Sequence, residues 1–184
     1  MKCSREHEGE ICLDCERWQL FYRKEGDPLI KNVSLYTYNS FMKEIVAKWK
    51  YRGDYILGTI FKNELKAAFH KHFHKIAKDA AIVPIPLSEE RLYERGFNQA
   101  EMLASFLTDE IVDILERIHS EKQSKKTRSE RMRSENPFTL RKPINKRVIL
   151  VDDIYTTGRT VRHAAQLLRN SGCKEVYAFT LIRG

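Results

Sequence analysis

The sequence has no long apolar segment. No apolar run approaches the roughly 20 residues that a helix needs to cross a bilayer, and no basic start leads into an apolar signal core. Internal repeats and low-complexity tracts are also missing. These absences predict a cytoplasmic protein with no membrane insertion. The 184 residues, 42% of them hydrophobic, are enough to bury the core of one domain.

Cysteine is scarce and unevenly placed. Three of the four cysteines, Cys3, Cys12 and Cys15, lie near the start of the chain. In a cytoplasmic chain the Cys12-x-x-Cys15 spacing favours half of a zinc site over a disulfide, because both thiolates can reach one tetrahedral ion. The fourth, Cys173, is expected to be a small buried apolar residue.

Negative charge is nearly absent from one basic segment. Residues 122–147 hold ten Lys or Arg and two acidic residues, a net charge of +8 that equals the net charge of the whole chain. The first part of this basic window is poor in apolar residues, which predicts a loop. Three interpretations stay open: a lid over an anionic ligand, an electrostatic track for nucleic acid, or an ordinary solvated loop.

The segment 148–161, VILVDDIYTTGRTV, carries the strongest signal. Its first four residues are apolar and three of them are β-branched, which indicates a strand 148–151 covered on both faces of a parallel sheet. An apolar stripe follows at helical spacing, and a second strand is expected over 176–181. The helical stripe consists of Val161, Ala164, Ala165 and Leu168. The turn 156–160 should therefore lie at the carboxyl edge of the sheet, where such folds bind ligands.

The chemistry of this turn suits a phosphorylated ribose. Free N–H groups at a helix start attract phosphate, and the hydroxyls of Thr156, Thr157 and Thr160 add donors. Asp152 and Asp153 are acceptors, which suit vicinal ribose hydroxyls. The alternative is an acidic strand end followed by an ordinary helix cap, but the register of the threonines and Gly158 after the strand favours a sugar-phosphate site.

A second strand, loop and helix precede this unit. Residues 80–85 read as a core strand that ends at two prolines, and an apolar stripe begins again at Ala100 after a predicted loop 87–97. Arg91, Arg95 and Gly96 should then face the same edge as Asp152. A solvated basic turn is the alternative.

The segment Lys50–Asp54 lies between two helical patterns, one over 41–49 and one over 57–65. Asp54 is a plausible N-cap for the second helix. Capping does not explain Lys50 and Arg52, which either face an anionic ligand or are ordinary surface residues.

At this point the chain resembles a known family. The 148–160 segment is similar to the 5-phosphoribosyl 1-pyrophosphate (PRPP) motif of type I phosphoribosyltransferases. Three further segments resemble the ComF (ComFC-like) competence-associated family, and the resemblance runs from Cys3 to the end. These are residues 50–54, residues 83–86 with 95–99, and the set Gln123, Arg131, Asn136 and Phe138.

The resemblance implies an α/β fold with a central, mostly parallel sheet flanked by helices. It implies a phosphoribosyltransferase-like domain over 31–184 and a cysteine-bearing N-terminal appendage over 1–30. PRPP-binding residues would be Asp152, Asp153, Tyr155, Thr156, Thr157, Gly158, Arg159 and Thr160. The pyrophosphate loop would contain Arg95, Gly96 and Asn98, with auxiliary anion-binding residues Lys50, Arg52 and Arg131.

The resemblance also implies cofactors. Mg²⁺ would accompany PRPP and bridge its pyrophosphate and ribose oxygens. ComF-like proteins carry a four-cysteine zinc module, whereas Cys3, Cys12 and Cys15 are the three cysteines in this region. A fourth Zn²⁺ ligand would come from upstream of Met1 or from His7.

Two functions follow from the resemblance. One is a PRPP-binding protein of DNA uptake and natural competence, with pentosyl transfer if it is active and with DNA-processing proteins as partners. Thr156 stands where enzymes acting on 6-oxopurines carry an Asp, which argues against hypoxanthine and guanine as acceptors. The alternative is an inactive single-stranded DNA module on the same fold. The basic window of the chain contains one aromatic residue, Phe138, which weakens this alternative, whereas Tyr51, Tyr93 and Phe97 are further candidates for base stacking if the fold brings them to the same edge.

We expect neutralising substitutions in the basic window to separate a lid from a track. Replacing Lys125, Lys126, Arg128 and Arg131 by Gln should weaken single-strand binding if they contact phosphates, and should flatten its dependence on log salt by about 0.7 per lost contact. A lid would instead lose PRPP affinity at an unchanged salt slope. Unaltered binding of both ligands would favour the third interpretation, an ordinary solvated loop.

Overall fold

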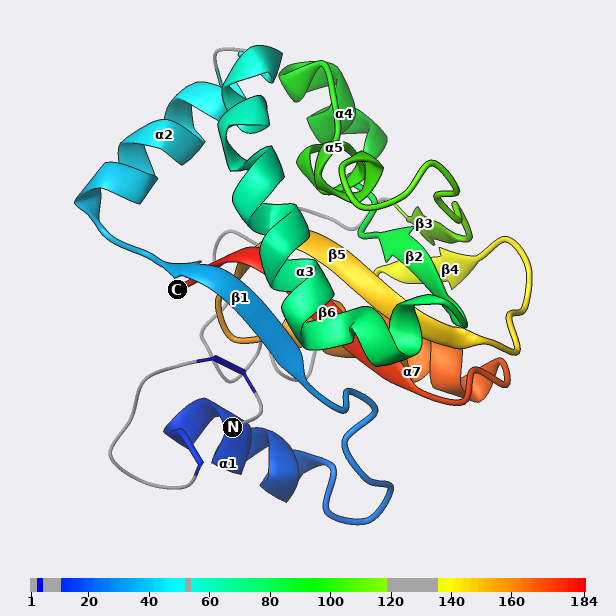
Figure 1. Cartoon of the computed structure of the whole chain (residues 1–184). Coiled ribbons are helices and arrows are strands. Elements are labelled where there is room, and N and C mark those ends of the chain that lie inside the picture. The colour runs from blue at the N-terminus through cyan, green and yellow to red at the C-terminus, as the bar shows by residue number, and fades with distance from the viewer. Residues whose placement is uncertain (1–2, 5–10, 52–53, 119–135) are drawn as a thin grey trace.

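The computed structural model describes residues 3–4, 11–51, 54–118 and 136–184. Its centre is a parallel four-stranded sheet in the order β1-β6-β5-β2 (Figure 1). These strands are β1 (Asn32–Thr37), β6 (Val176–Arg183), β5 (Arg147–Tyr155) and β2 (Ala80–Pro84). A two-stranded antiparallel sheet pairs β3 (Leu115–Arg117) with β4 (Phe138–Leu140). The predicted α/β class is confirmed.

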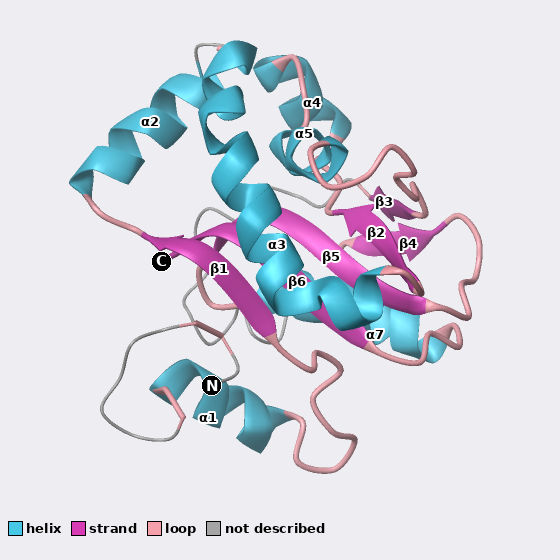
Figure 2. Cartoon of the chain, viewed as in Figure 1, coloured by secondary structure: helices cyan, strands magenta, loops and turns pink. Residues whose placement is uncertain are grey.

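Helices cover both faces of the sheet (Figure 2). Figure 1 shows α3 crossing in front of the sheet and α7 lying behind it. The helices in chain order are α1 (Leu13–Phe21), α2 (Ser40–Tyr51), α3 (Lys62–Ala77), α4 (Glu89–Arg95), α5 (Gln99–Ser105) and α7 (Arg159–Asn170), with a 3₁₀ helix η1 (Tyr55–Phe61) before α3. No helix in the described part of the chain is both long and apolar enough to cross a membrane.

The central strand β5 explains the unbroken apolar run. Val148 and Leu150 pack in the cluster that contains the apolar stripe of α7, whereas Ile149 and Val151 pack in the cluster of α3 and α5. Each of the four is at most 1% exposed. A strand buried on both faces needs apolar residues at every position. The strand continues to Tyr155, beyond the predicted end at residue 151, because β6 pairs with it as far as Arg183.

Several local predictions need correction. The predicted loop 87–97 contains α4, which begins at the capping hydroxyl of Ser88 and ends at Gly96, where φ is +76°. None of the residues of α4 is buried, so no apolar stripe marks it in the sequence. Asp54 occupies the N-cap position of η1, but its side chain makes no capping hydrogen bond.

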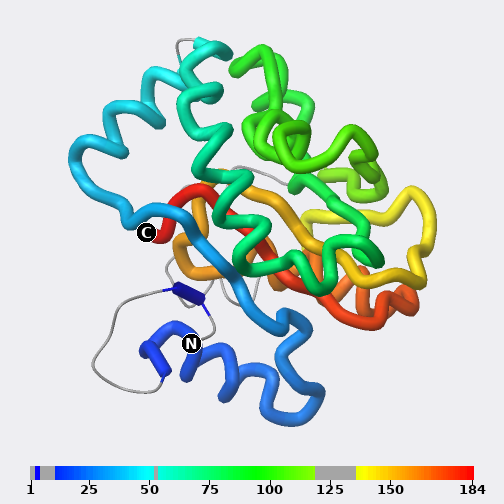
Figure 3. Tube along the Cα trace, viewed as in Figure 1, coloured from blue at the N-terminus to red at the C-terminus, as the bar shows by residue number. Residues whose placement is uncertain are grey.

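The N-terminal segment is tied to the sheet domain by a buried ion pair. Arg162 of α7 donates from Nε and Nη2 to the carboxylate of Asp27, with a shortest distance of 2.9 Å, and the two side chains are 1% and 6% exposed. Segments from opposite ends of the chain thus lie side by side, as the trace in Figure 3 shows. At the same end, Arg183 Nη2 donates to the Asp14 carboxylate at 3.3 Å.

We expect Asp27→Asn to lower the free energy of unfolding by about 3 kcal/mol, because it leaves the Arg162 charge buried without its counter-charge. Denaturant titration measures this loss. The control is Asp113→Asn, which breaks the exposed ion pair to Arg141 and should cost less than about 1 kcal/mol. Equal effects of the two substitutions would contradict the assignment.

Candidate functional site

Two carboxylates lie near the end of β5 and one of them is already paired. Asp153 forms an ion pair with Lys50 from the last turn of α2, and both side chains are nearly buried. Asp152 Oδ1 accepts the backbone N–H of Asp153 at 2.9 Å. Lys50, which we expected to face an anionic ligand, therefore meets the acidic pair at the carboxyl edge of the sheet.

Asp152 is harder to ionise than an ordinary carboxyl group. Burial raises the pKa of Asp152 to about 7, and the neighbouring charge of Asp153 adds to the shift. The N–H of Asp153, Lys50 and Arg117 oppose it. A carboxyl group that titrates near neutral pH is a frequent property of binding and catalytic sites.

Arg117 is near Asp152, and other arginines are near Arg117. The pKa of Arg117, at the end of β3, is lowered by burial and by the positive charges of Arg91 and Arg95, whereas Asp152 raises it. Burial, Arg159 and Arg117 together lower the pKa of His163 to about 4. Cations from α4, β3 and α7 thus influence one region, an arrangement that suits a ligand with several negative charges.

Arg117 was missed by the sequence analysis. It belongs to a three-residue strand with no apolar periodicity, and it reaches the site because β3 pairs with β4. Its guanidinium lies 5.5 Å from the ring centroid of Phe138, its partner in the β3–β4 register. The pairing of β3 with β4, two segments that are 20 residues apart in the sequence, brings Arg117 to this edge.

The turn after β5 leaves a helix start open. Gly158 has φ +78° and occupies the N-cap position of α7 without a side-chain cap. First-turn N–H groups of an uncapped helix are available to an anion. Thr156 and Thr160 are exposed and Thr157 is half-buried. A Cβ at Gly158 would overlap the hydroxyl of Tyr155 and the guanidinium of Arg162.

Side chains from the protein interior hold four consecutive carbonyl groups of this turn. Arg183 donates to the first two, the indole N–H of Trp18 to the third, and Arg162 to the fourth. The carbonyls are those of Tyr155, Thr156, Thr157 and Gly158, at 3.1, 2.5, 2.6 and 3.3 Å. Because the carbonyls bond inward, the turn is fixed from behind while its threonines remain on the outside.

Tyr155 is part of this support. Its side chain is 2% exposed and its hydroxyl accepts from Arg162 at 2.7 Å. The ring also lies 4.9 Å from the guanidinium of Arg183. We predicted Tyr155 as a PRPP contact, and its position under the turn gives it a supporting role for the residues that follow.

The predicted pyrophosphate loop lies between α4 and α5. Arg95 donates to Gln99 Oε1 at 2.9 Å, and Gly96 ends α4. Asn98 caps α5 by accepting the N–H of Ala100, and its amide donates to the carbonyl of Ile85. The Asn98 side chain is thus engaged in holding the loop to the end of β2. Arg52, Arg131 and the rest of residues 122–135 of the basic window lie outside the described residues.

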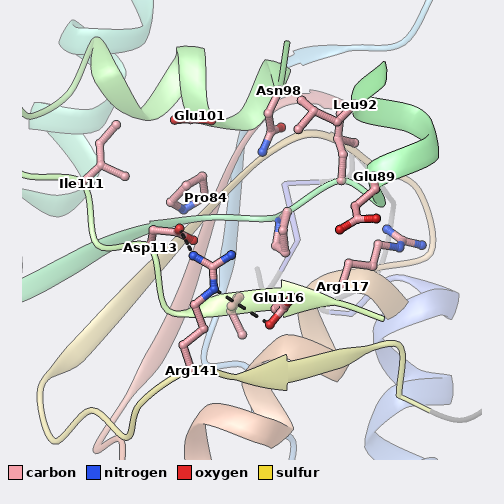
Figure 4. Close-up of a pocket in the computed structure, with 13 residues that line it drawn as sticks. Pro84, Glu89, Leu92, Asn98, Glu101, Ile111, Asp113, Glu116, Arg117 and Arg141 are labelled. Carbon is pink, nitrogen blue, oxygen red and sulfur yellow. Dashed lines mark hydrogen bonds and ion pairs between the residues drawn. The ribbon is translucent and has the colours of Figure 1, made fainter. Parts of the chain in front are cut away.

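A pocket of about 320 Å³ opens beside the arginines (Figure 4). Arg117 lines it on one side, and the opposite side comes from α4 and α5. Arg141 lies within it and forms ion pairs with Asp113 and Glu116. Glu89 and Glu101 also line the pocket, so its wall contains four acidic side chains and two arginines. The pocket is suited to a neutral or positively charged group rather than to phosphate.

The three N-terminal cysteines form a buried cluster. Their Sγ atoms lie within 4.8 Å of one another, and those of Cys3 and Cys12 are 3.3 Å apart. All three are reduced, outside any disulfide, and at most 4% exposed. A tetrahedral zinc with Zn–S bonds of about 2.3 Å places its sulfurs about 3.8 Å apart, so the cluster fits Zn²⁺. His7, one predicted fourth ligand, lies outside the described residues.

The neighbouring sulfurs make the Cys15 thiol harder to ionise. Hydrogen bonding to Cys3 and burial raise the pKa of Cys15 far above its usual range. A cation is needed before all three can bind as thiolates.

The acidic pair on β5 offers only two carboxylates, a number that suits a Mg²⁺ ion completed by ligand phosphates and water. Cys173 is buried elsewhere and donates to the carbonyl of Lys146, as a small buried residue.

Comparisons with known proteins agree with this geometry. Residues 92–184 match the family model described as "Phosphoribosyl transferase domain". The chain is 43% identical over 176 residues to "Competence protein ComFC" of Bacillus subtilis, covering 94% of this chain and 72% of the relative. It is 36% identical to the Streptococcus pneumoniae protein of the same name, covering 98% and 79%. "DNA utilization protein YhgH" of Escherichia coli K12 is 33% identical over 110 residues, covering 55% and 48%.

Solved structures are more distant. A hypoxanthine phosphoribosyltransferase from Staphylococcus aureus aligns with a TM-score of 0.44 at 16% identity, covering 68% of this chain and 64% of that chain. A purine phosphoribosyltransferase from Pyrococcus horikoshii aligns with a TM-score of 0.37 at 18% identity, covering 66% and 82%. Likeness at this level says nothing about the substrate of this chain.

The raised pKa of Asp152 predicts a stability that depends on pH. An unfolded chain releases this proton near pH 3.9 and the folded chain near pH 7, so the carboxyl destabilises the fold increasingly between these values. We expect Asp152→Asn to raise the free energy of unfolding by about 1–2 kcal/mol at pH 8 and to leave it unchanged at pH 3. Denaturant titrations at both pH values measure this. A stabilisation that does not grow with pH would contradict the shifted pKa.

Proposed function

This chain belongs to the ComFC family of competence proteins, with a phosphoribosyltransferase domain, and we propose that it binds PRPP with Mg²⁺ at the carboxyl edge of β5. One observation carries the proposal: two carboxylates lie near the end of the strand that leads into an uncapped helix start, and Asp152 is close enough to Arg117 for each charge to influence the other. A phosphorylated ribose bearing pyrophosphate needs acceptors for its hydroxyls and donors for its two anionic groups.

The proposal gives each group a role. Asp152 and Asp153 accept the ribose hydroxyls, and the turn 156–160 with Arg159 binds the 5-phosphate. Arg95 and Gly96, together with Arg117, face the pyrophosphate. Asn98 holds their loop in place through its bonds to Ile85 and Ala100. Lys50 pairs directly with Asp153 and fixes the position of its carboxylate.

Pentosyl transfer is the reaction that this arrangement supports. A nitrogen nucleophile would displace pyrophosphate from C1 of the ribose, and positive charge would develop on the sugar. Arginines near the pyrophosphate stabilise the negative charge of the leaving group, while the carboxylates lie on the side of the positive sugar. Mg²⁺, held by the acidic pair and by ligand oxygens, would add to the stabilisation of the leaving group. Thr156 offers no carboxylate to a purine base, so a 6-oxopurine acceptor is not proposed.

We place this activity in natural competence and DNA uptake, in line with the names of the relatives, and in the cytoplasm, where free cysteines persist as thiols. DNA-processing proteins are the expected partners. Single-stranded DNA binding is the second candidate. Phe138, the aromatic of the basic window, is 3% exposed and pairs with Arg117, so it offers no face for base stacking. Tyr51 and Tyr93, at 76% and 92% exposure on α2 and α4, do offer such faces.

We expect the double substitution Asp152→Asn and Asp153→Asn to weaken PRPP binding at least 100-fold in calorimetry with excess Mg²⁺, because both acceptors for the ribose are lost. The circular dichroism spectrum should not change. The control exchanges the two nearby pocket acids, Asp113→Asn with Glu116→Gln, and should bind PRPP as the unsubstituted protein does. Full affinity in the first double variant would remove the assignment.

A further inference from the structure

The helix α1 contacts both the cysteine cluster and the turn of residues 156–160 after β5. We call this segment the phosphate turn, because we propose that it binds the 5-phosphate. Cys12 directly precedes it and Cys15 lies in its first turn. Two other side chains of the same helix reach the turn after β5. Asp14 accepts from Arg183, which holds the carbonyls of residues 155 and 156, and Trp18 donates to the carbonyl of Thr157 at 2.6 Å. Asp14 and Trp18 are 6% and 3% exposed.

A second path runs through the ring of Trp18. The guanidinium of Arg162 lies 4.8 Å from this ring and donates to the Tyr155 hydroxyl and to the Gly158 carbonyl. Trp18 therefore supports the turn twice, by its indole N–H and by the arginine that stacks on it. One helical turn separates Trp18 from Cys15, so a shift at the cluster reaches the carbonyl of Thr157 through rigid backbone.

The helix α1 begins without a side-chain cap. It is nine residues long. Leu13, Leu20 and Phe21 are at least half exposed, so apolar packing fixes only part of it. A helix this short is marginal alone. A cation bound by the three thiolates would fix the start of α1 directly.

We propose that a thiophilic divalent cation in the Cys3–Cys12–Cys15 cluster and the phosphorylated ligand bind with positive coupling, and that Trp18 and Asp14 are positioning residues of the phosphate turn. The coupling rests on the proposed function for the identity of that ligand. Loss of the cation loosens the start of α1 and with it the donors to the carbonyls of the turn. By linkage, the cation strengthens PRPP binding and PRPP strengthens cation binding by the same factor.

The first test compares the full chain loaded with one Zn²⁺ and the same protein after chelation. We expect PRPP affinity, measured by calorimetry with excess Mg²⁺, to fall about 5- to 50-fold on chelation. Chelator competition should show Zn²⁺ held more tightly by the same factor when PRPP is bound. Equal PRPP affinity in zinc-loaded and zinc-free folded protein would overturn the proposal, as would a chain that takes up no zinc.

Trp18→Phe isolates the path and does not depend on removing metal. The phenyl ring keeps stacking area for Arg162 but has no N–H for Thr157. We expect zinc content to stay at one per chain while PRPP affinity falls several-fold. The matched control, Leu20→Ala on the exposed face of the same helix, should change neither. If chelation unfolds the chain, the comparison of Trp18→Phe with Leu20→Ala tests the proposal instead. Equal PRPP affinity in these two variants would overturn it.

Hydrogen exchange separates this proposal from the proposed function. The amides of residues 155–162 should exchange several-fold faster in Trp18→Phe and in zinc-free protein, whether or not PRPP is present. If the zinc-loaded chain does not bind PRPP, but Trp18→Phe and the zinc-free protein still show this faster exchange, the link from the cluster to the turn is retained and the PRPP assignment is lost. Unchanged exchange in both would remove the coupling.

Discussion

The buried guanidinium of Arg162 requires a counter-charge and hydrogen-bond acceptors from other parts of the structure. It is 1% exposed, and a charge so placed is tolerated only when it is paired and hydrogen-bonded. Asp27 supplies the counter-charge, Trp18 the aromatic face, and the carbonyl of Gly158 with the hydroxyl of Tyr155 the remaining acceptors. Trp18, Gly158 and Tyr155 belong to the turn after β5 or directly support it. The N-terminal segment is thus needed to complete the fold at the site, even though its described residues, 3–4 and 11–30, contribute no strand to the sheet.

The carboxyl edge of β5 is assembled at an electrostatic cost. Two adjacent acids and several arginines are held in one region, and the pKa values of Asp152 and Arg117 move in opposite directions, toward the neutral forms of both groups. Such an arrangement lowers the stability of the free protein and gains from a ligand that brings both hydroxyl donors and phosphate oxygens. Fixing the turn through its carbonyls reduces the ordering that the ligand has to impose.

The sequence predicted those parts of the fold that repeat a local pattern. The four apolar residues of β5 and the stripe of α7 are buried as their spacing requires, and Gly158 marks the turn between them. The helix α4 was missed because it buries none of its residues. The strand β1 was missed because no boundary was recognised between it and the segment before it. Local patterns report on which face of an element is buried, and an exposed helix leaves no such signal.

The residues that complete the site are joined by contacts far apart in the chain. Asp27 meets Arg162 across 135 positions and Trp18 meets Thr157 across 139, and no spacing rule links such pairs. Arg162 directly follows Val161 of the predicted apolar stripe, but nothing local distinguishes it from a solvent-facing arginine. Lys50 was identified as unexplained by capping, yet its pairing with Asp153 is a tertiary contact that only the packed helix α2 reveals.

The central claim is that the end of β5 and the start of α7 together hold a phosphorylated ribose. A crystal structure of the zinc-loaded protein grown with PRPP and Mg²⁺ tests this most directly. The account predicts ribose hydroxyls within hydrogen-bonding distance of the Asp152 and Asp153 carboxylates, and the 5-phosphate on the N–H groups of residues 156–160. Ligand density at any other surface, with this edge occupied only by water, would contradict it.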